Sequence, residues 1–416
     1  MGFILKKLII ECRFSDSFER NGEVNLKEDA NKTLKMLYLA KRLVFVTIII
    51  YIVVFFVVNS SYLSADNIER FTFTLKKTLT ESYAEGTQKR VALMYDEGAE
   101  EISFKDGFAV LSTGTLTIYS ADMVKFSSHS IGYKQPVLLA SANNLICFDL
   151  GGKKLSVFDS FDLITEKTFK NNILNVAVSD SGYTAVITEE YGYKGLVTVY
   201  NEDFKEVMQW YSADYYLMYL GFTQRNTVSV VAVKPNNENI DTYVIDFNYK
   251  VGEERRVVCA ENRFPMSAYV KNDSFLEIVS DLDIITFRDE GYETLFNYGS
   301  AEILTYKQFD QYTVVVAVED SVKNLYRITV IDTDGNKEFE KIFIGYRDIE
   351  FFNGYFFVLG NGTVTTVGLE GQEVGLLQVS PDVFKILVSR GFALLIEPEQ
   401  INEIDSSELF EYHQTN

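Results

Sequence analysis

A repeat of about 40 residues runs from Lys89 to the end of the chain and restricts the fold more than any other feature. Each unit holds a turn residue, an aromatic or apolar strand, a loop, a second β-branched strand, and an acidic or glycine turn. Such units lie at 105–120, 142–160, 180–203, 224–248, 271–289, 309–335, 352–371 and 389–405. A period of this length is typical of a propeller blade with four strands. We therefore predict an all-β fold, a β-propeller of four-stranded blades, over residues 89–416.

The two ends of the repeat region indicate how the ring closes. The last unit lacks a fourth strand, and the segment Lys89–Tyr95 (KRVALMY) is a strand without a unit of its own. We expect this N-terminal strand to complete the last blade, because closure removes two unpaired strand edges. The favoured number of blades is eight, with seven as the alternative if one terminal unit is degenerate. A β-sandwich is disfavoured because its strands repeat less evenly.

An uncharged apolar run, Leu43–Val58 (LVFVTIIIYIVVFFVV), precedes the repeats and continues without charge to Ala65. About 20 such residues cross a hydrocarbon core about 30 Å thick. A cleaved signal peptide would begin nearer the N-terminus and end at a small-residue site. We predict one transmembrane helix over residues 43–63.

Charge predicts the orientation of that helix. Residues 1–42 hold nine Lys or Arg residues, with Lys41 and Arg42 next to the span. The positive-inside rule places this side in the cytoplasm. We expect a cytoplasmic tail (1–42), a stalk (64–88) that is a spacer or an edge strand, and an extracytoplasmic domain (89–416). The protein is thus predicted to lie in the cell membrane as a single-pass protein.

The formal net charge is −20, and the acidic surplus lies after residue 42. This charge repels nucleic acid and anionic lipid headgroups, so no nucleic-acid partner is expected. Of the three cysteines, Cys147 and Cys259 lie in apolar strand-like runs. Two cysteines cannot frame so large a domain, so we expect buried free thiols; whether they pair stays open.

The residue inventory restricts the chemistry. The two histidines, His129 and His413, are too few for a histidine-rich zinc site, and they disfavour a Ser-His-Asp triad. The run Asp332–Asn336 (DTDGN) resembles the start of a calcium loop, but an Asp-Gly hairpin explains it better. No catalytic, metal or cofactor residue is predicted. A glycosidase needs only two carboxylates, so a glycan-active enzyme stays open as an alternative.

One candidate binding site is aromatic, and it comes from two segments that a propeller brings to the same face. Its members are Tyr191, Tyr193, Trp210, Tyr211 and Tyr215. Tyrosine and tryptophan beside acidic residues on exposed loops are typical of protein or carbohydrate contact surfaces. The alternative is that Tyr215 begins an alternating strand with Leu217 and Tyr219, and that these side chains pack between blades.

A single N-terminal span followed by a divergent propeller resembles an uncharacterised family of bacterial single-pass membrane proteins. That family carries a PQQ-like or WD-like propeller outside the membrane and has no assigned activity. The Gly-His and Trp-Asp signatures of WD repeats are absent, and Trp210 is the single tryptophan, whereas quinone-enzyme propellers have regular tryptophan docking positions. No cofactor is therefore expected.

Taken together, these features predict a membrane-anchored propeller that binds a protein or a cell-envelope polymer as a scaffold or sensor. Two alternatives stay open: a glycan-active enzyme with paired carboxylates, and an accessory subunit of an envelope assembly or export machine.

Overall fold

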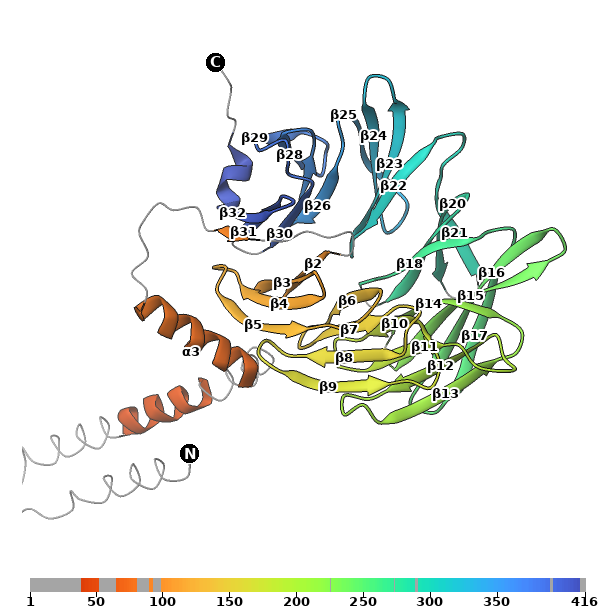
Figure 1. Ribbon diagram of the computed structural model, residues 1–416, viewed down its shortest axis with the longest axis horizontal. Helices are drawn as coiled ribbons and strands as arrows, with labels where there is room; N and C mark the ends of the chain where they lie inside the picture. The colour runs from red at the N-terminus through yellow and green to blue at the C-terminus, as the bar shows by residue number, and fades with distance from the viewer. Residues whose placement is uncertain are drawn as a thin grey trace, which may run out of the picture. The chain divides into compact units, whose positions relative to one another are not determined.

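The computed structural model describes residues 39–51, 65–80, 90–92, 99–224, 226–272, 274–288, 291–389 and 392–411. The chain divides into two compact units, residues 1–68 and 69–416. In the first unit residues 39–51 are helical. The second unit contains a ring of β-sheets, each with four antiparallel strands (Figure 1).

The described strands form eight such sheets, so the predicted eight-bladed propeller is confirmed. In blades I to VII the four strands follow one another in sequence. Blade I consists of β2 (Glu100–Phe104), β3 (Gly107–Ser112), β4 (Thr115–Ser120) and β5 (Lys125–Ser130), and blade II of β6 (Pro136–Ala140), β7 (Leu145–Asp149), β8 (Lys154–Phe158) and β9 (Leu163–Thr168). Blade III consists of β10 (Ile173–Val178), β11 (Thr184–Thr188), β12 (Gly195–Tyr200) and β13 (Glu206–Ser212), and blade IV of β14 (Tyr216–Phe222), β15 (Thr227–Asn236), β16 (Asn239–Asn248) and β17 (Glu253–Ala260).

Blade V consists of β18 (Pro265–Lys271), β19 (Phe275–Ser280), β20 (Asp283–Arg288) and β21 (Gly291–Asn297), and blade VI of β22 (Ile303–Gln308), β23 (Tyr312–Asp320), β24 (Leu325–Asp332) and β25 (Lys337–Ile344). Blade VII consists of β26 (Asp348–Phe352), β27 (Tyr355–Leu359), β28 (Thr363–Gly368) and β29 (Glu373–Gln378), and blade VIII of β30 (Lys385–Ser389), β31 (Phe392–Ile396), β32 (Gln400–Ile404) and β1 (Arg90–Ala92). The first strands of neighbouring blades contact one another, as in β10 with β14 and β26 with β30, so these strands line the inside of the ring.

Ring closure follows the predicted route. The N-terminal strand β1 pairs antiparallel with β32, with Val91 opposite Ile401. In Figure 1 the orange start of the propeller lies beside the blue strands β31 and β32. Blades VIII and I also share an apolar cluster that contains Phe108 and Phe392. The sheet edge of the last blade is thereby covered, which removes a site for pairing with other chains.

Apolar clusters lie between the blades rather than within them. The second and third strands are largely buried in most blades, as in β11, β12 and β15, because both of their faces meet a neighbouring blade. The described residues form one cluster at each of the eight junctions between blades. Continuous β-branched and aromatic runs are therefore the sequence signal of these strands.

The chain end packs on blade VII as the 3-10 helix η1 (Ser406–Phe410), which begins with a capping box of Asp405 and Glu408. Leu409 is fully buried, and its carbonyl oxygen accepts a hydrogen bond from the Thr366 hydroxyl. A Cβ atom at Gly375 would lie 2.2 Å from that same carbonyl oxygen. Glycine is thus required here for close approach.

The stalk differs from the prediction of a spacer or edge strand. Residues Ala65–Thr80 form the helix α3. Its residue Arg70 is 3% exposed and donates to Asp106 and to the Ser160 hydroxyl (2.8 Å), while its guanidinium lies 4.6 Å from the Phe126 ring centre. The ring of Phe73 contacts the same Phe126 ring at 5.7 Å. Positions 70 and 73 lie on the same face of the helix because they are three residues apart. The alternating Phe-Thr-Phe-Thr pattern of residues 71–74 indicated strand spacing instead, so the sequence did not predict this helix.

The predicted transmembrane span, residues 43–63, lies partly outside the described residues, which omit 52–64. Among the residues that are described, no helix is both long and apolar enough to cross a membrane. The anchor therefore stays a prediction from the sequence.

The Asp332–Asn336 segment is the tight turn between β24 and β25, as the hairpin interpretation predicts. Gly335 has φ of 82°, and the Asp332 carboxylate accepts hydrogen bonds from the backbone N–H groups of Asp334 and Asn336, each 2.8 Å long. Cys147 is buried in β7, Cys259 is half-buried in β17, and both are free thiols. Burial raises the pKa of Cys147 to about 12.

Candidate functional site

Because the strands of a blade are antiparallel, its connections alternate between the two faces of the ring. We call the AB face the one that carries the first-to-second and third-to-fourth strand connections. The BC face carries the second-to-third connections and the links to the next blade. Helix α3 packs on the AB face, since its partners Asp106 and Ser160 lie in the β2–β3 and β8–β9 connections.

Three of the five predicted aromatic residues are exposed on the BC face. Tyr191, in the β11–β12 connection, is 97% exposed. Tyr193 lies in the same connection, and its ring contacts that of Tyr211 on β13, with ring centres 5.0 Å apart. A fourth exposed tyrosine, Tyr216, has the Lys194 ammonium 4.5 Å from its ring centre. These side chains form an aromatic surface next to the start of blade IV.

The other two predicted residues pack between blades III and IV. Trp210 is half-buried, and its ring centre lies 4.8 Å from that of Phe247 on β16. The ring of Tyr215 lies 4.9 Å from that of Tyr243. Both belong to the border of the apolar cluster at this junction. The predicted group is thus divided: Tyr191, Tyr193 and Tyr211 face solvent, while Trp210 and Tyr215 fill the space between blades.

Exposed apolar side chains concentrate on the BC face of the described propeller. Twelve large hydrophobic residues are exposed at its loops and adjoining strand ends: Leu150, Tyr191, Tyr193, Tyr211, Tyr216, Ile240, Phe264, Met266, Leu282, Leu304, Val322 and Ile344. The loops and adjoining strand ends of the AB face expose four, Leu163, Ile164, Val207 and Val251, and helix α3, which packs on this face, adds Phe71, Phe73 and Leu75. One of the twelve, Ile240, lies in the long β15–β16 hairpin, which projects from the ring (Figure 1).

A recess of about 340 Å³ lies on the BC face between blades V and VI. Three exposed apolar residues, Met266, Leu282 and Leu304, stand around it. Its lining includes Tyr298, whose buried hydroxyl has no hydrogen-bond partner among the described residues. Burial raises the pKa of this hydroxyl, so it stays protonated and able to donate. The recess thus combines apolar walls with an unsatisfied donor.

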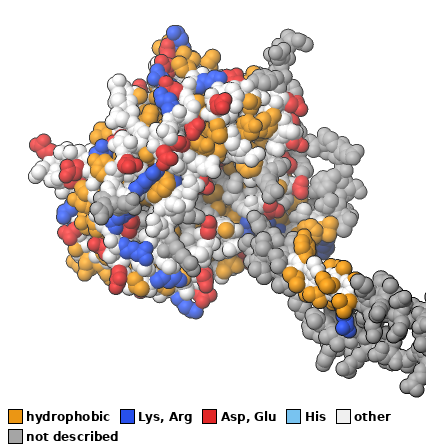
Figure 2. Space-filling model, turned by 180° about the vertical axis from the view of Figure 1, so that it is seen from behind, with side chains coloured by type: hydrophobic (Ala, Val, Ile, Leu, Met, Phe, Trp, Pro, Cys, Tyr) orange, Lys and Arg blue, Asp and Glu red, His pale blue; other side chains and the backbone are white. Residues whose placement is uncertain are grey.

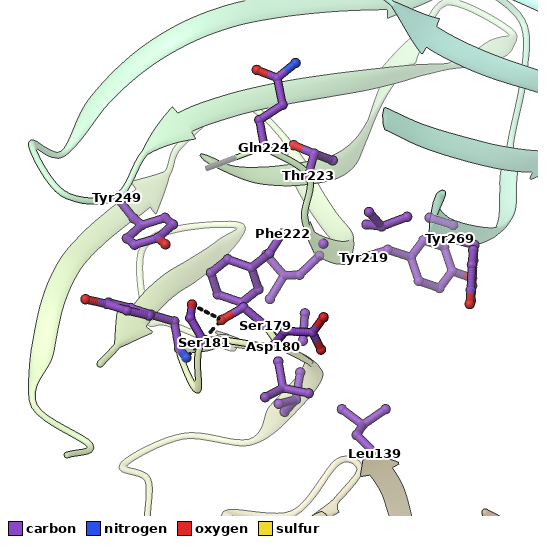
Figure 3. Close-up of a pocket in the computed structure, with 18 of the residues that line it drawn as sticks. Leu139, Ser179, Asp180, Ser181, Tyr219, Phe222, Thr223, Gln224, Tyr249 and Tyr269 are labelled. Carbon is purple, nitrogen blue, oxygen red and sulfur yellow. Dashed lines mark hydrogen bonds between the residues drawn. The ribbon is translucent and has the colours of Figure 1, made fainter. Parts of the chain in front are cut away.

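A larger cavity, of about 780 Å³, opens on the AB face and was not found from the sequence (Figure 3). Its lining comes from the ends of the inner strands of blades II to V, from the turns that follow β10 and β14, and from the turn after β16. It also includes Asp310 after β22. Tyr219 and Tyr269 stand on one side, and Phe222 and Tyr249 on the other. These residues are far apart in sequence, so no local pattern could have linked them.

Buried ion pairs join neighbouring inner strands elsewhere in the ring. The Lys307 ammonium on β22 contacts Asp348 (3.2 Å) and Glu350 (2.7 Å) on β26, and Lys385 on β30 contacts Glu101 on β2 (2.9 Å). Burial raises the pKa of the Glu350 carboxyl, although Lys307 acts in the opposite direction. The carboxylates at these positions are thus held by lysines of adjacent blades.

On the face shown in Figure 2 the acidic side chains do not gather in one place. In Figure 2 Asp and Glu side chains are interspersed with hydrophobic and basic ones over the face shown. Within the part of the chain that the structure describes, no group of three or more His, Cys, Asp or Glu residues has the geometry of a metal site.

Solved structures with the same fold are distant in sequence. The crystal structure of BamB from Moraxella catarrhalis matches with a TM-score of 0.50 and 12% identity, over 79% of this chain and 99% of that chain. The structure of the Dos1 propeller matches with a TM-score of 0.52 and 12% identity, over 78% and 96%. The quinohemoprotein alcohol dehydrogenase ADHIIG from Pseudomonas putida HK5 matches with a TM-score of 0.50 and 8% identity, over 80% and 77%.

At these identities the similarity shows the fold alone, and it confirms the PQQ-like propeller that the resemblance implied. No curated protein sequence matches the chain. A family model does match residues 76–405, which is the α3 end, the closing strand and all eight blades. The chain therefore belongs to the family described as "Family of unknown function (DUF5711)".

Proposed function

We propose that this protein is a membrane-anchored, extracytoplasmic scaffold that binds a partner protein through the BC face of its propeller. The observation that carries the proposal is the concentration of exposed apolar side chains on that face. Exposed apolar surface beyond scattered single residues marks interaction sites, and aromatic anchors contribute most of the binding energy at protein interfaces.

The recess between blades V and VI supports a protein as the partner. Leu304 and Leu282 offer apolar walls that an apolar side chain of a partner protein would contact. Interface hot spots commonly insert such an anchor into a well-packed, desolvated pocket. An envelope polymer rich in hydroxyl groups would gain less from apolar walls of this kind.

The position of the stalk helix supports the choice of face. Helix α3 packs on the AB face through Arg70 and Phe73. These contacts lie within the propeller unit and occupy the AB face, so a partner on the BC face would not compete with them.

The carboxylates of the inner strands β2 and β26 are poorly suited to glycan hydrolysis. A hydrolase needs one carboxylic acid and one carboxylate that both reach the substrate. Asp348 and Glu350 share the ammonium of Lys307, and Glu101 is held by Lys385. An accessory subunit of an envelope assembly is one form that the proposed scaffold would take.

Site-specific photo-crosslinking in living cells tests the proposal. A photoreactive amino acid at Leu282 or Leu304 should give one discrete crosslinked product, and the same amino acid at Val207 or Val251 on the AB face should not. Leu304→Glu should abolish the product from position 282, with Val207→Glu as the matched control. Equal products from both faces, or a product that survives Leu304→Glu, would contradict a partner site on the BC face.

A further inference from the structure

The 780 Å³ cavity on the AB face has the size and construction of a ligand site. Binding pockets for small molecules commonly measure about 300–1,000 Å³ and combine aromatic walls with a few polar groups. A second recess of about 650 Å³ adjoins the cavity and shares Tyr269 and Asp310 with it. Between them the two recesses are lined by residues from the AB ends of blades II to VII. This span leaves room for a chain of several ring-sized units.

Aromatic rings supply the apolar part of the cavity. Tyr219 and Tyr269 come from the inner strands β14 and β18, and Phe222 and Tyr249 lie across from them (Figure 3). Tyr183 also lines the cavity. The ring of Tyr249 contacts Tyr183 at 4.9 Å and Phe222 at 5.6 Å, so these three rings support one another. Rigid rings present flat apolar area at little cost in conformational entropy.

Unused polar groups lie beside the rings. The side chains of Asn175, Asp180 and Gln224 line the cavity, and none of them is hydrogen-bonded within the described residues. The two amides each offer donors and an acceptor, and the carboxylate accepts only. Ser179 and Ser181 stand next to Asp180, with their hydroxyl oxygens 3.1 Å apart. The site thus offers both donors and acceptors to a ligand that has both.

The charge of the cavity disfavours anions. Lys250 is the one cation among the described lining residues, and it donates to the Tyr183 hydroxyl with its ammonium 4.4 Å from that ring centre. Two carboxylates, Asp180 and Asp310, also line the cavity, and Asp310 accepts a hydrogen bond from the Tyr269 hydroxyl (2.9 Å). Among the described lining residues, two carboxylates thus face one ammonium group, which disfavours a phosphate or an acidic sugar.

We infer that this cavity binds a neutral oligosaccharide. A pyranose ring has one face of C–H groups, which pack on aromatic rings, and an equator of hydroxyl groups, which both donate and accept hydrogen bonds. The rings of Tyr219 and Tyr269 would pack on the C–H face of the sugar. The side chains of Asn175, Asp180 and Gln224 would form hydrogen bonds with its hydroxyl groups. The inference uses a different face from the proposed protein partner, so either proposal stands or fails without the other.

Titration of the full-length protein with neutral tetrasaccharides tests this inference. The protein is held in a detergent without a sugar headgroup, and the probes are chitotetraose, cellotetraose and maltotetraose. Calorimetry and saturation-transfer NMR should show saturable binding of at least one probe. Tyr269→Ala should weaken binding about tenfold or more, and Tyr269→Phe should retain most of it because the ring is kept.

Further variants separate a specific site from a folding defect. Gln224→Ala and Asp180→Asn change side chains that are exposed, so both should weaken binding without lowering the melting temperature. Tyr326→Ala, on β24 away from the cavity, is the aromatic control and should bind normally. The inference is overturned if none of the three tetrasaccharides binds, if Tyr269→Ala binds as well as wild type, or if the cavity takes only a lysine-rich peptide.

Discussion

Asp283 is a carboxylate that the fold buries almost completely, with 1% of its surface exposed. The Arg263 guanidinium donates to both of its oxygens, with distances between 2.8 and 3.1 Å, and the Ser280 hydroxyl adds a bond of 2.8 Å. Burial alone would raise the pKa of Asp283, but the hydrogen bonds from Arg263 and Ser280 outweigh it and lower the pKa below 3.8. The ionised carboxylate is thus the form that the fold stabilises.

We expect Asp283→Asn to destabilise the protein, because it leaves Arg263 without its charge partner. The loss should be about 3 kcal/mol at pH 7, the size found when one partner of a buried ion pair is removed. Because the folded pKa is lowered, this contribution is present above pH 3.8 and is lost as the pH falls through the folded value. Denaturant unfolding at pH 7 and at pH 3 measures both effects.

The matched control is Asp203→Asn, which removes an exposed pair with Lys205. Exposed pairs contribute little, so its free energy of unfolding should change by less than about 0.5 kcal/mol at either pH. A difference between wild type and Asp283→Asn that stays constant from pH 7 to pH 3 would contradict the assigned role of the carboxylate.

Trp210 and Tyr211 are adjacent on β13, yet the structure gives them opposite environments. Trp210 packs on Phe247 of the next blade, and Tyr211 is exposed beside Tyr193. Trp210→Ala should therefore lower the free energy of unfolding by about 2 kcal/mol, and Tyr211→Ala by less than about 0.5 kcal/mol. Thermal unfolding of the two single variants compares them directly. Equal losses would mean that the two side chains share one role.

At the scale of elements, two N-terminal segments are used in different ways by the same propeller. Strand β1 enters the sheet of blade VIII through a ladder with β32, whereas α3 packs on the AB face through side chains. A ladder satisfies backbone groups that would otherwise be left at a sheet edge. The side-chain contacts of α3 do not change the hydrogen bonding of any sheet. Removal of β1 and release of α3 should therefore affect the stability of the propeller differently.

Removal of β1 should destabilise the whole ring. A chain that begins at Asp96 lacks β1, and a chain that begins at Thr87 keeps it, while both lack α3. The shorter chain should melt several degrees lower and associate more readily, because the edge of β32 is exposed. Calorimetry and light scattering of the pair measure the difference. Identical melting of the two chains would rule out β1 as the closing strand.

Loss of the Arg70 contacts should release α3 without unfolding the propeller. Arg70→Ala removes the hydrogen bonds to Asp106 and Ser160 and the contact with Phe126. Hydrogen exchange in residues 69–80 should accelerate about tenfold or more, while the β-strands keep their protection. Glu69→Ala, one position earlier and exposed, is the control and should leave the exchange unchanged. Accelerated exchange throughout the strands would show that α3 is part of the propeller core.

At the scale of the whole molecule, the proposed anchor and the proposed partner face are linked by chain direction. Lys41 and Arg42 precede the apolar run, and the propeller follows it. Helix α3 connects the two and contacts the AB face. A partner on the BC face would then bind on the side of the ring that lies opposite to the stalk contact.

We expect protease added to intact spheroplasts to digest the propeller and to spare the cytoplasmic tail, residues 1–42. The physical reason is the excess of lysine and arginine on one side of the span, which fixes orientation during insertion. Antibodies against the two ends of the chain report which part survives, and lysed spheroplasts, in which both parts are digested, are the control. A protected propeller would reverse the proposed topology and with it the extracytoplasmic role.

The sequence alone determined the blades and their closure, because strand runs and turn residues are local signals that repeat. The pattern of Lys89–Tyr95 was enough to assign the closing strand, and the eight units correspond to the eight sheets. The exposed Tyr191 was likewise predictable from its loop.

The tertiary structure decided what depends on neighbours distant in the chain. It placed Trp210 against Phe247, and it made residues 65–80 of the stalk a helix that packs through Arg70. It also assembled the AB cavity from the inner strands of several blades. Burial between blades and contacts across blades arise only when the ring closes. A local sequence pattern therefore cannot predict them.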